Sequence, residues 1–326
     1  DDFSAGFAVR GAPFGRVGLY LDGVLMHAPF HTIDGQPDNG SLATFSSALI
    51  DRMTLYEGAW PVQYGNRTAG VLAIETRQGT RDRPRADVDV GVSDATVTVE
   101  GPLGRARRAA FLVSARKSFL QYILNRIDFG DEPPFVFGFA DVDARVDVDV
   151  NAANAVSLTV LHGVSAVDRT RYADRLAPTA TMTSGFSLTQ LNAAWRHTSA
   201  TTIVTTRAAY ATDAGHVESP RRLPLSTQTY REGTARTDAT RMFGTRQALD
   251  VGGEVHEVRQ SGTATTLVYT PALVAALDAF GGATRRAGGY VGGRSAFGRL
   301  DLAAGGRVDA DRVTGKPLGS GYGSLA

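Results

Sequence analysis

Histidine is the residue type in this sequence best suited to acid–base chemistry or metal binding, and it occurs six times, at 27, 31, 162, 197, 216 and 256. No pair has the His-Glu-x-x-His spacing that presents two imidazoles to zinc on one helix face. His27 and His31 share a polar segment with Asp34 and Asp38, but a solvated loop explains this grouping without a metal. The chain has no cysteine, which excludes thiolate sites and disulfides.

Two further spacings resemble known site motifs but lack essential members. Residues 147–151, Asp-Val-Asp-Val-Asn, open like a calcium loop, which needs glycine at its sixth position and glutamate at its twelfth. This chain has Ala152 and Leu158 there. Residues 114–117, Ser-Ala-Arg-Lys, match the spacing of a penicillin-binding nucleophile motif without its Ser-Asp-Asn partner. We therefore predict no enzyme activity, no cofactor and no metal site.

Charge and hydropathy exclude two further classes. The formal net charge of +1 gives no reason to expect a nucleic-acid partner, which favours a basic face. The chain has no run of about 18 apolar residues, so it has no transmembrane helix. A membrane β-barrel is still compatible, because each strand needs only about 9–11 residues of alternating polarity. The sequence starts without methionine or a signal peptide and stops within an expected loop, so we expect a fragment.

Residues 1–80 predict a small mixed α+β unit that differs in composition from the rest. Ser41 can cap a helix in which Leu42, Phe45 and Leu49 share one face. We expect strands at 17–21, 52–56 and 71–76, a loop at 29–40 and a helix at 41–50.

From residue 86 onward the pattern has period two. Residues 141–150 place valine and alanine on one face and aspartate and arginine on the other. A soluble β-sandwich would bury the valines and turn the acids to water. A membrane barrel would turn the valines to lipid and the acids to its lumen. This strand alone leaves both alternatives open.

The connections between the expected strands alternate in length. From the second strand on, short connections follow long ones, as in outer-membrane barrels with short periplasmic turns and long outer loops. The eleven expected strands are at 86–92, 95–100, 109–116, 139–150, 155–163, 186–197, 201–211, 242–257, 263–270, 287–297 and 299–310. The long connections are at 117–138, 164–185, 212–241 and 271–286.

Four ordered segments of the N-terminal unit carry a family resemblance. They are Phe-Ala-Val-Arg-Gly at 7–11, Tyr-Leu-Asp-Gly at 20–23, the strand at 50–58, and residues 64–77 from Tyr-Gly-Asn-Arg to Glu-Thr-Arg. In this order they resemble the plug of TonB-dependent outer-membrane receptors. These segments are similar in sequence to those of the subgroup that often carries an N-terminal carboxypeptidase-regulatory-like domain. Gly-Gly-Arg-Val-Asp at 305–309 resembles a strand midway round such barrels.

The resemblance implies a mainly β fold. A small mixed α+β plug domain, lacking its N-terminal part, is expected at 1–80, and antiparallel transmembrane β-barrel strands are expected at 86–326. The family barrel has 22 strands around a plugged lumen. About eleven strands therefore imply an open, incomplete barrel, with an unpaired edge at the strand 299–310.

The resemblance also implies a function, namely a TonB-dependent receptor in the outer membrane of a Gram-negative-type bacterium. It would take up a small nutrient ligand, such as a siderophore, glycan or peptide, by energy-coupled remodelling of the plug. The expected partners are outer-membrane lipid and TonB, the latter through a segment missing from this chain. Arg10 and Arg67 are expected to pair with barrel glutamates, and the connection at 212–241 is the best ligand candidate on the barrel. The expected ligand-facing residues on apical plug loops are His27, His31, Gln36, Asp38, Asn39, Trp60 and Tyr64.

Two alternatives belong to other classes. The first is an outer-membrane surface-binding or adhesion protein that transports nothing. The second is a soluble β-sandwich binding protein, in which the alternating valines would pack into a core.

Overall fold

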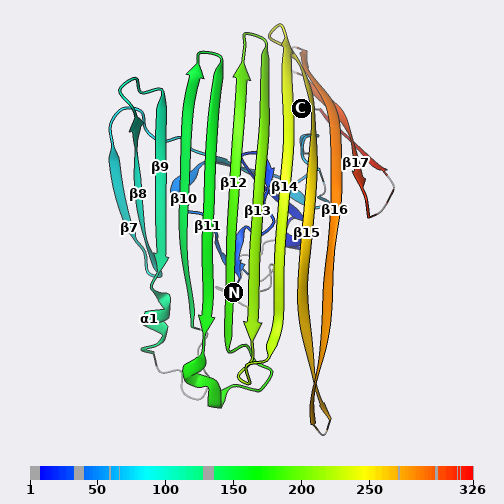
Figure 1. The fold of residues 1–326 in the computed structure, drawn as a ribbon. Helices are drawn as coiled ribbons and strands as arrows, with labels where there is room; N and C mark the ends of the chain where they lie inside the picture. The colour runs from blue at the N-terminus through cyan, green and yellow to red at the C-terminus, as the bar shows by residue number, and fades with distance from the viewer. Residues whose placement is uncertain are drawn as a thin grey trace.

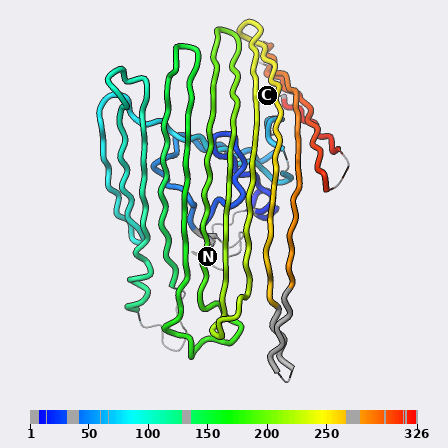
Figure 2. Tube along the Cα trace, viewed as in Figure 1, coloured from blue at the N-terminus to red at the C-terminus, as the bar shows by residue number. Residues whose placement is uncertain are grey.

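The structure is a computed structural model that describes residues 8–32, 40–58, 60–65, 67–127, 136–270, 272–297, 300–313, 315 and 317–325. It consists of a small N-terminal domain and a large antiparallel sheet (Figure 1). Figure 2 shows the N-terminal domain, drawn in blue, against the middle strands of this sheet. Among the described residues, no helix is both long and apolar enough to cross a membrane.

The N-terminal domain is built on a four-stranded sheet in the order β2-β1-β6-β5. Its central strands β1 and β6 are parallel, and β2 and β5 flank them in the antiparallel sense. The hairpin β3–β4 forms a separate two-stranded sheet. The elements are η1 (Phe14–Arg16), β1 (Val17–Leu21), β2 (Val24–Leu25), β3 (Phe30–Thr32), β4 (Gly40–Ala43), η2 (Ser47–Leu49), β5 (Ile50–Tyr56) and β6 (Gly70–Thr76).

The helix predicted at 41–50 is wrong. This segment begins in strand β4 and then forms only the short 3₁₀ helix η2, which Ser46 caps by accepting a hydrogen bond from Ala48. Phe45 and Leu49 do enter the core, as their apolar character requires. Pairing of β4 with β3 uses backbone groups that a helix would need, so tertiary packing overrides a weak local preference.

The large sheet contains twelve strands in chain order, each antiparallel to the next. Its terminal strands β7 and β18 are not paired with each other in the described part of the chain, so it is an open, incomplete barrel. The strands are β7 (Arg85–Val90), β8 (Asp94–Leu103), β9 (Ala109–Ser118), β10 (Phe137–Asn151), β11 (Asn154–Asp168), β12 (Thr183–Thr198), β13 (Thr202–Glu218), β14 (Pro224–Phe243), β15 (Gln247–Thr270), β16 (Ala272–Phe297), β17 (Leu300–Asp311) and β18 (Pro317–Leu325). The helices α1 (Leu120–Leu124) and η3 (Thr170–Arg175) lie in connections.

Strand β10 shows which face of the large sheet is turned inward. Asp143 and Asp147 are buried against the N-terminal domain, and Asp143 has no exposed surface. Val142 and Val150 lie on the opposite face and are 49% and 52% exposed. Apolar residues continue over this outer face, among them Leu158, Leu191, Val251 and Val291. The polarity is that of a membrane barrel, apolar outside and polar inside, so the sandwich alternative, which requires buried valines, is wrong.

Four corrections apply to the predicted strands and their connections. The structure adds β14 and β18, and it joins the strands predicted at 242–257 and 263–270 into β15. The long connection predicted at 212–241 is consequently wrong, because β13 and β14 leave only residues 219–223 between them. The unpaired edge lies at β18 instead of at 299–310.

The alternation of connections holds in the first half of the sheet. The long connections after β9 and β11, which contain α1 and η3, lie at one end of the strands, and the short turns at 152–153 and 199–201 lie at the other (Figure 1). Beyond β13 the strands extend into the expected loops. The long connection predicted at 271–286 is wrong, because β16 already begins at Ala272.

Candidate functional site

The turn between β1 and β2 is held against the inner face of the large sheet, called the wall below. Asp22 and Gly23 both adopt positive φ, at 50° and 81°. The Asp22 carboxylate accepts hydrogen bonds from the Thr76 amide (2.9 Å) and from Arg145 (2.9 Å). Arg207 Nε donates to the Asp22 carbonyl at 2.8 Å. A Cβ on residue 23 would lie 3.1 Å from the guanidinium carbon of Arg207, so glycine fits this close approach.

Arg145 on β10 joins the wall to the N-terminal domain. Its Nε and one terminal nitrogen donate to the two Asp147 oxygens, both at 2.8 Å. The other terminal nitrogen donates to Asp22 and to the Thr76 hydroxyl. The guanidinium therefore compensates two carboxylates in a mostly buried position, where losing one partner of an ion pair is costly.

The hairpin β3–β4 is fixed by a second buried contact. His31 Nε2 lies 2.6 Å from Asp141 Oδ1, and neither side chain has exposed surface. Arg116 donates to the other Asp141 oxygen and to the carbonyl of Ala43. His31, expected to face a ligand, is instead packed between the N-terminal domain and the wall, because its partner is a wall carboxylate.

Gly163 on β11 makes room for this contact, and replacing it with alanine tests its importance. The added Cβ would lie 2.7 Å from Asp141 Oδ1 and 3.1 Å from a His31 ring carbon. We expect Gly163→Ala to destabilise docking of the N-terminal domain by about 1–3 kcal/mol through overpacking. Urea-dependent protease cleavage of this domain measures the effect. Gly233→Ala on β14 is the matched control, since a Cβ there meets nothing within 4 Å; equal effects of both changes would contradict the proposed fit.

His27 makes a third contact with the wall. Its Nδ1 lies 2.8 Å from Asp213 Oδ2, and its ring stacks on Tyr230 with centroids 3.5 Å apart. Tyr230 in turn donates to Glu232 at 2.6 Å. The His27 side chain is 31% exposed, so it keeps some of the accessibility that a ligand contact requires.

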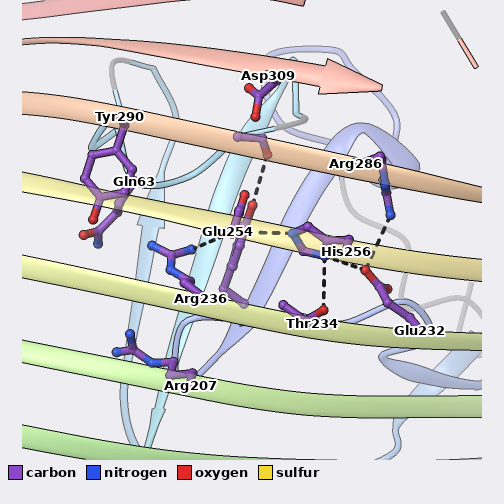
Figure 3. A network of polar contacts seen from close by, with 12 residues as sticks. Gln63, Arg207, Glu232, Thr234, Arg236, Glu254, His256, Arg286, Tyr290 and Asp309 are labelled. Atoms are coloured by element: carbon purple, nitrogen blue, oxygen red, sulfur yellow. Dashed lines mark hydrogen bonds and ion pairs between the residues drawn. The ribbon is translucent and has the colours of Figure 1, made fainter. Parts of the chain in front are cut away.

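A polar network runs along the wall strands β14 to β17 (Figure 3). His256 Nδ1 lies 2.7 Å from Glu232 and 3.1 Å from the Thr234 hydroxyl, and its Nε2 lies 3.5 Å from Glu254. Arg286 approaches Glu232 at 3.5 Å. The imidazole thus lies between two buried carboxylates, near the middle of β15.

The same network continues toward the short-turn end. Arg236 binds both Asp238 oxygens and reaches Glu254 at 3.3 Å. Arg307, 2% exposed, pairs with Glu254 and donates to the Gln63 carbonyl at 3.3 Å. The wall acids are therefore compensated mainly by wall cations, and the N-terminal domain contributes a backbone carbonyl here.

Trp60 and Tyr64 belong to a loop that closes on itself. Trp60 donates its indole N–H to the Tyr64 carbonyl at 3.1 Å, and the Tyr64 ring lies 4.8 Å from that of Tyr20. Tyr20 donates to the Gly65 carbonyl at 3.0 Å. Burial, and then the nearby Glu254 carboxylate, raise the pKa of Tyr20 to about 12, so this donor stays protonated at neutral pH. Trp60 and Tyr64 are half-buried, and their ligand role stays a prediction.

The two arginines expected to pair with barrel glutamates differ. Arg10 is exposed at a turn with φ of 52°, within the described residues it has no ion pair with a wall carboxylate, and its pairing stays a prediction. Arg67 lines a cavity together with Glu232, and burial lowers the pKa of its guanidinium. Gln36, Asp38 and Asn39 lie outside the described residues.

Sequence reasoning missed the residues that fix the N-terminal domain to the wall, namely Asp22, Arg145 and Arg207. In the sequence, the charged row of β10 is compatible with both a water-facing strand and a barrel lumen. The charge of this row could have revealed the contact with the plug, because carboxylates and arginines on the inner face of a barrel strand need partners from whatever fills the lumen.

Two cavities lie between the N-terminal domain and the wall, beside the contacts described above. The larger, of about 760 Å³, is bounded by the Asp22–Gly23 turn and by wall residues that include Asp149 and Asp238. The smaller, of about 380 Å³, is lined by His27, Arg67 and wall strands β14 to β17. Within the described residues, no group of three or more His, Cys, Asp or Glu side chains could hold a metal ion.

Residues 1–72 match the family model of the TonB-dependent receptor plug domain. The chain comprises this plug and part of its β-barrel. The plug match and the barrel fold place the chain in the outer membrane. No curated protein sequence is significantly similar to the chain.

Solved structures of such receptors share the fold of this chain. The ferric yersiniabactin uptake receptor FyuA from Yersinia pestis has a TM-score of 0.71 at 12% identity, over 100% of this chain and 55% of that one. A ferric enterobactin receptor (PfeA) mutant from Pseudomonas aeruginosa, in complex with enterobactin, gives 0.71 at 13%, over 98% and 53%. The outer membrane transporter YddB from Escherichia coli gives 0.68 at 12%, over 98% and 52%. The chain thus spans about half the length of these structures.

Proposed function

We propose that this chain is part of a TonB-dependent outer-membrane transporter that takes up a small nutrient ligand by energy-coupled displacement of its plug. The observation that carries the proposal is how the plug is held. At Asp22, His31 and His27 it meets the barrel through hydrogen bonds and ion pairs. Such polar contacts can be exchanged for water or ligand groups, so the plug can be both anchored and displaced.

The long connections face the outside in this scheme, and the short turns face the periplasm. Ligand would bind near the apical plug segment that includes Gln36, Asp38 and Asn39, and near the half-exposed His27. TonB would then pull on a plug segment from the periplasmic side. Three of the similar structures are described as receptors for ferric siderophores or ferric citrate, so ferric chelates are the first ligand class to test.

Uptake of radiolabelled iron tests this function in cells that carry the complete gene. Ferric enterobactin, ferric yersiniabactin and ferric citrate serve as probes, followed by glycans and peptides. We expect uptake of at least one probe to be lost when either this gene or tonB is deleted. Binding without TonB-dependent uptake of any probe would overturn transport and favour the surface-binding alternative.

A further inference from the structure

The inner face of β14 forms a continuous polar row. Side chains two residues apart lie on the same face of a strand, and here they are all polar or hydrogen-bonding. Counted from the long-connection end to the short-turn end, they are Tyr230, Glu232, Thr234, Arg236, Asp238 and Thr240.

The two cavities between plug and wall meet opposite halves of this row. Tyr230 and Glu232 line the smaller cavity, and Arg236 and Asp238 line the larger one. Four residues of strand, about 13 Å, separate Glu232 from Arg236. Both volumes lie in the range of about 300–1,000 Å³ that holds small-molecule ligands. Along the inner face of β14, Thr234 lies between the residues that line the smaller cavity and those that line the larger one.

The separation at Thr234 is made of polar side chains (Figure 3). On the wall, Thr234 meets His256 at 3.1 Å, and His256 spans Glu232 and Glu254. On the plug side, Tyr20 is close enough to Glu254 for the carboxylate to affect its hydroxyl. These groups can exchange hydrogen bonds with a passing solute.

We propose that solute crosses between plug and barrel along the inner face of β14, from the smaller cavity past Thr234 to the larger one. This route rests on the proposed transport function. It selects a polar or charged hydrogen-bonding solute, because an apolar one would displace water from Glu232, Arg236 and Glu254 without offering them hydrogen bonds in return.

Among the described residues, the plug–wall contact is packed at two other places. On the β9–β11 side, wall residues Leu112 and Leu161 belong to the hydrophobic core of the plug. On the β16 side, a Cβ on Gly292 would lie 3.0 Å from Val62. Motion that opens the β14 side can therefore leave these contacts in place.

Single cysteines test the route, because the chain has none of its own. Thr234→Cys lies on the route, Thr159→Cys lies on the inner face of β11 away from it, and Ala235→Cys lies on the outer face of β14. The full-length receptor is labelled in cells with a small, membrane-impermeant cationic methanethiosulfonate. We expect position 234 to react at least about tenfold faster than 159, since local opening differs between the two sides, and position 235 not to react.

Equal rates at 234 and 159 would overturn the route, because they would mean that the whole plug leaves together. Faster reaction at 159, or none at 234, would also overturn it. The same measurement in cells without tonB separates the two proposals. The ratio between the positions tests the route, and a fall in both rates without tonB tests energy coupling.

Discussion

Replacing Arg145 with alanine is expected to weaken plug docking by about 3–5 kcal/mol, because it leaves carboxylates unpaired in a buried interface. Asp22 and Asp147 would both lose this guanidinium. The urea concentration at which protease cleaves the plug of the full-length receptor should then fall by at least about 1 M. Barrel folding should persist, since no strand pairing depends on this side chain.

Two further variants sharpen the Arg145 experiment. Arg145→Lys keeps the charge but loses the two-pronged contact with Asp147, so it should give an intermediate value. Arg259→Ala removes an arginine whose pair with Glu257 is exposed, and it should leave the midpoint unchanged. If Arg145→Ala and Arg259→Ala behave alike, the buried bridge does not hold the plug.

Placing a charge on the outer face of β10 is expected to impair membrane insertion, by an amount that depends on depth. Val142→Arg should cost about 2–4 kcal/mol near the middle of the bilayer, because the guanidinium would face hydrocarbon. The fraction of folded, heat-modifiable receptor in the outer membrane measures the loss.

Val150→Arg is the control for this effect. Val150 has similar exposure but lies beside the short turn that ends β10, where the cost of arginine falls to about 0–1 kcal/mol. Equal losses from both variants would indicate that the outer face of the strand does not contact lipid as we describe.

The sequence predicts the barrel strands where an apolar outer row contrasts with a polar inner row, as in β10. It fails at β14, where the outer row includes Arg231, Gly233, Ala235 and Thr237. Without that contrast, a strand with a polar lumen face is indistinguishable from a polar loop. The plug is easier to predict, because its short segments occur in a fixed order that resembles a known family.

The candidate site is much less predictable from sequence than the fold. His31 looks like a solvated loop histidine, yet its partner Asp141 lies 110 positions away. The partner of the Asp22 carbonyl, Arg207, lies 185 positions away. No local pattern reports such pairings, since they depend on how the plug is oriented inside the barrel.

The chain-order pairing of the large sheet has a consequence for how the receptor assembles. Each wall strand contacts the strand just before it, so the sheet can grow by successive hairpins between neighbours in sequence, at low entropic cost. The contacts with the plug are the opposite case, since Arg307 meets Gln63 across 244 positions. Assembly should therefore end with capture of the plug, whose polar surface selects the correctly formed wall.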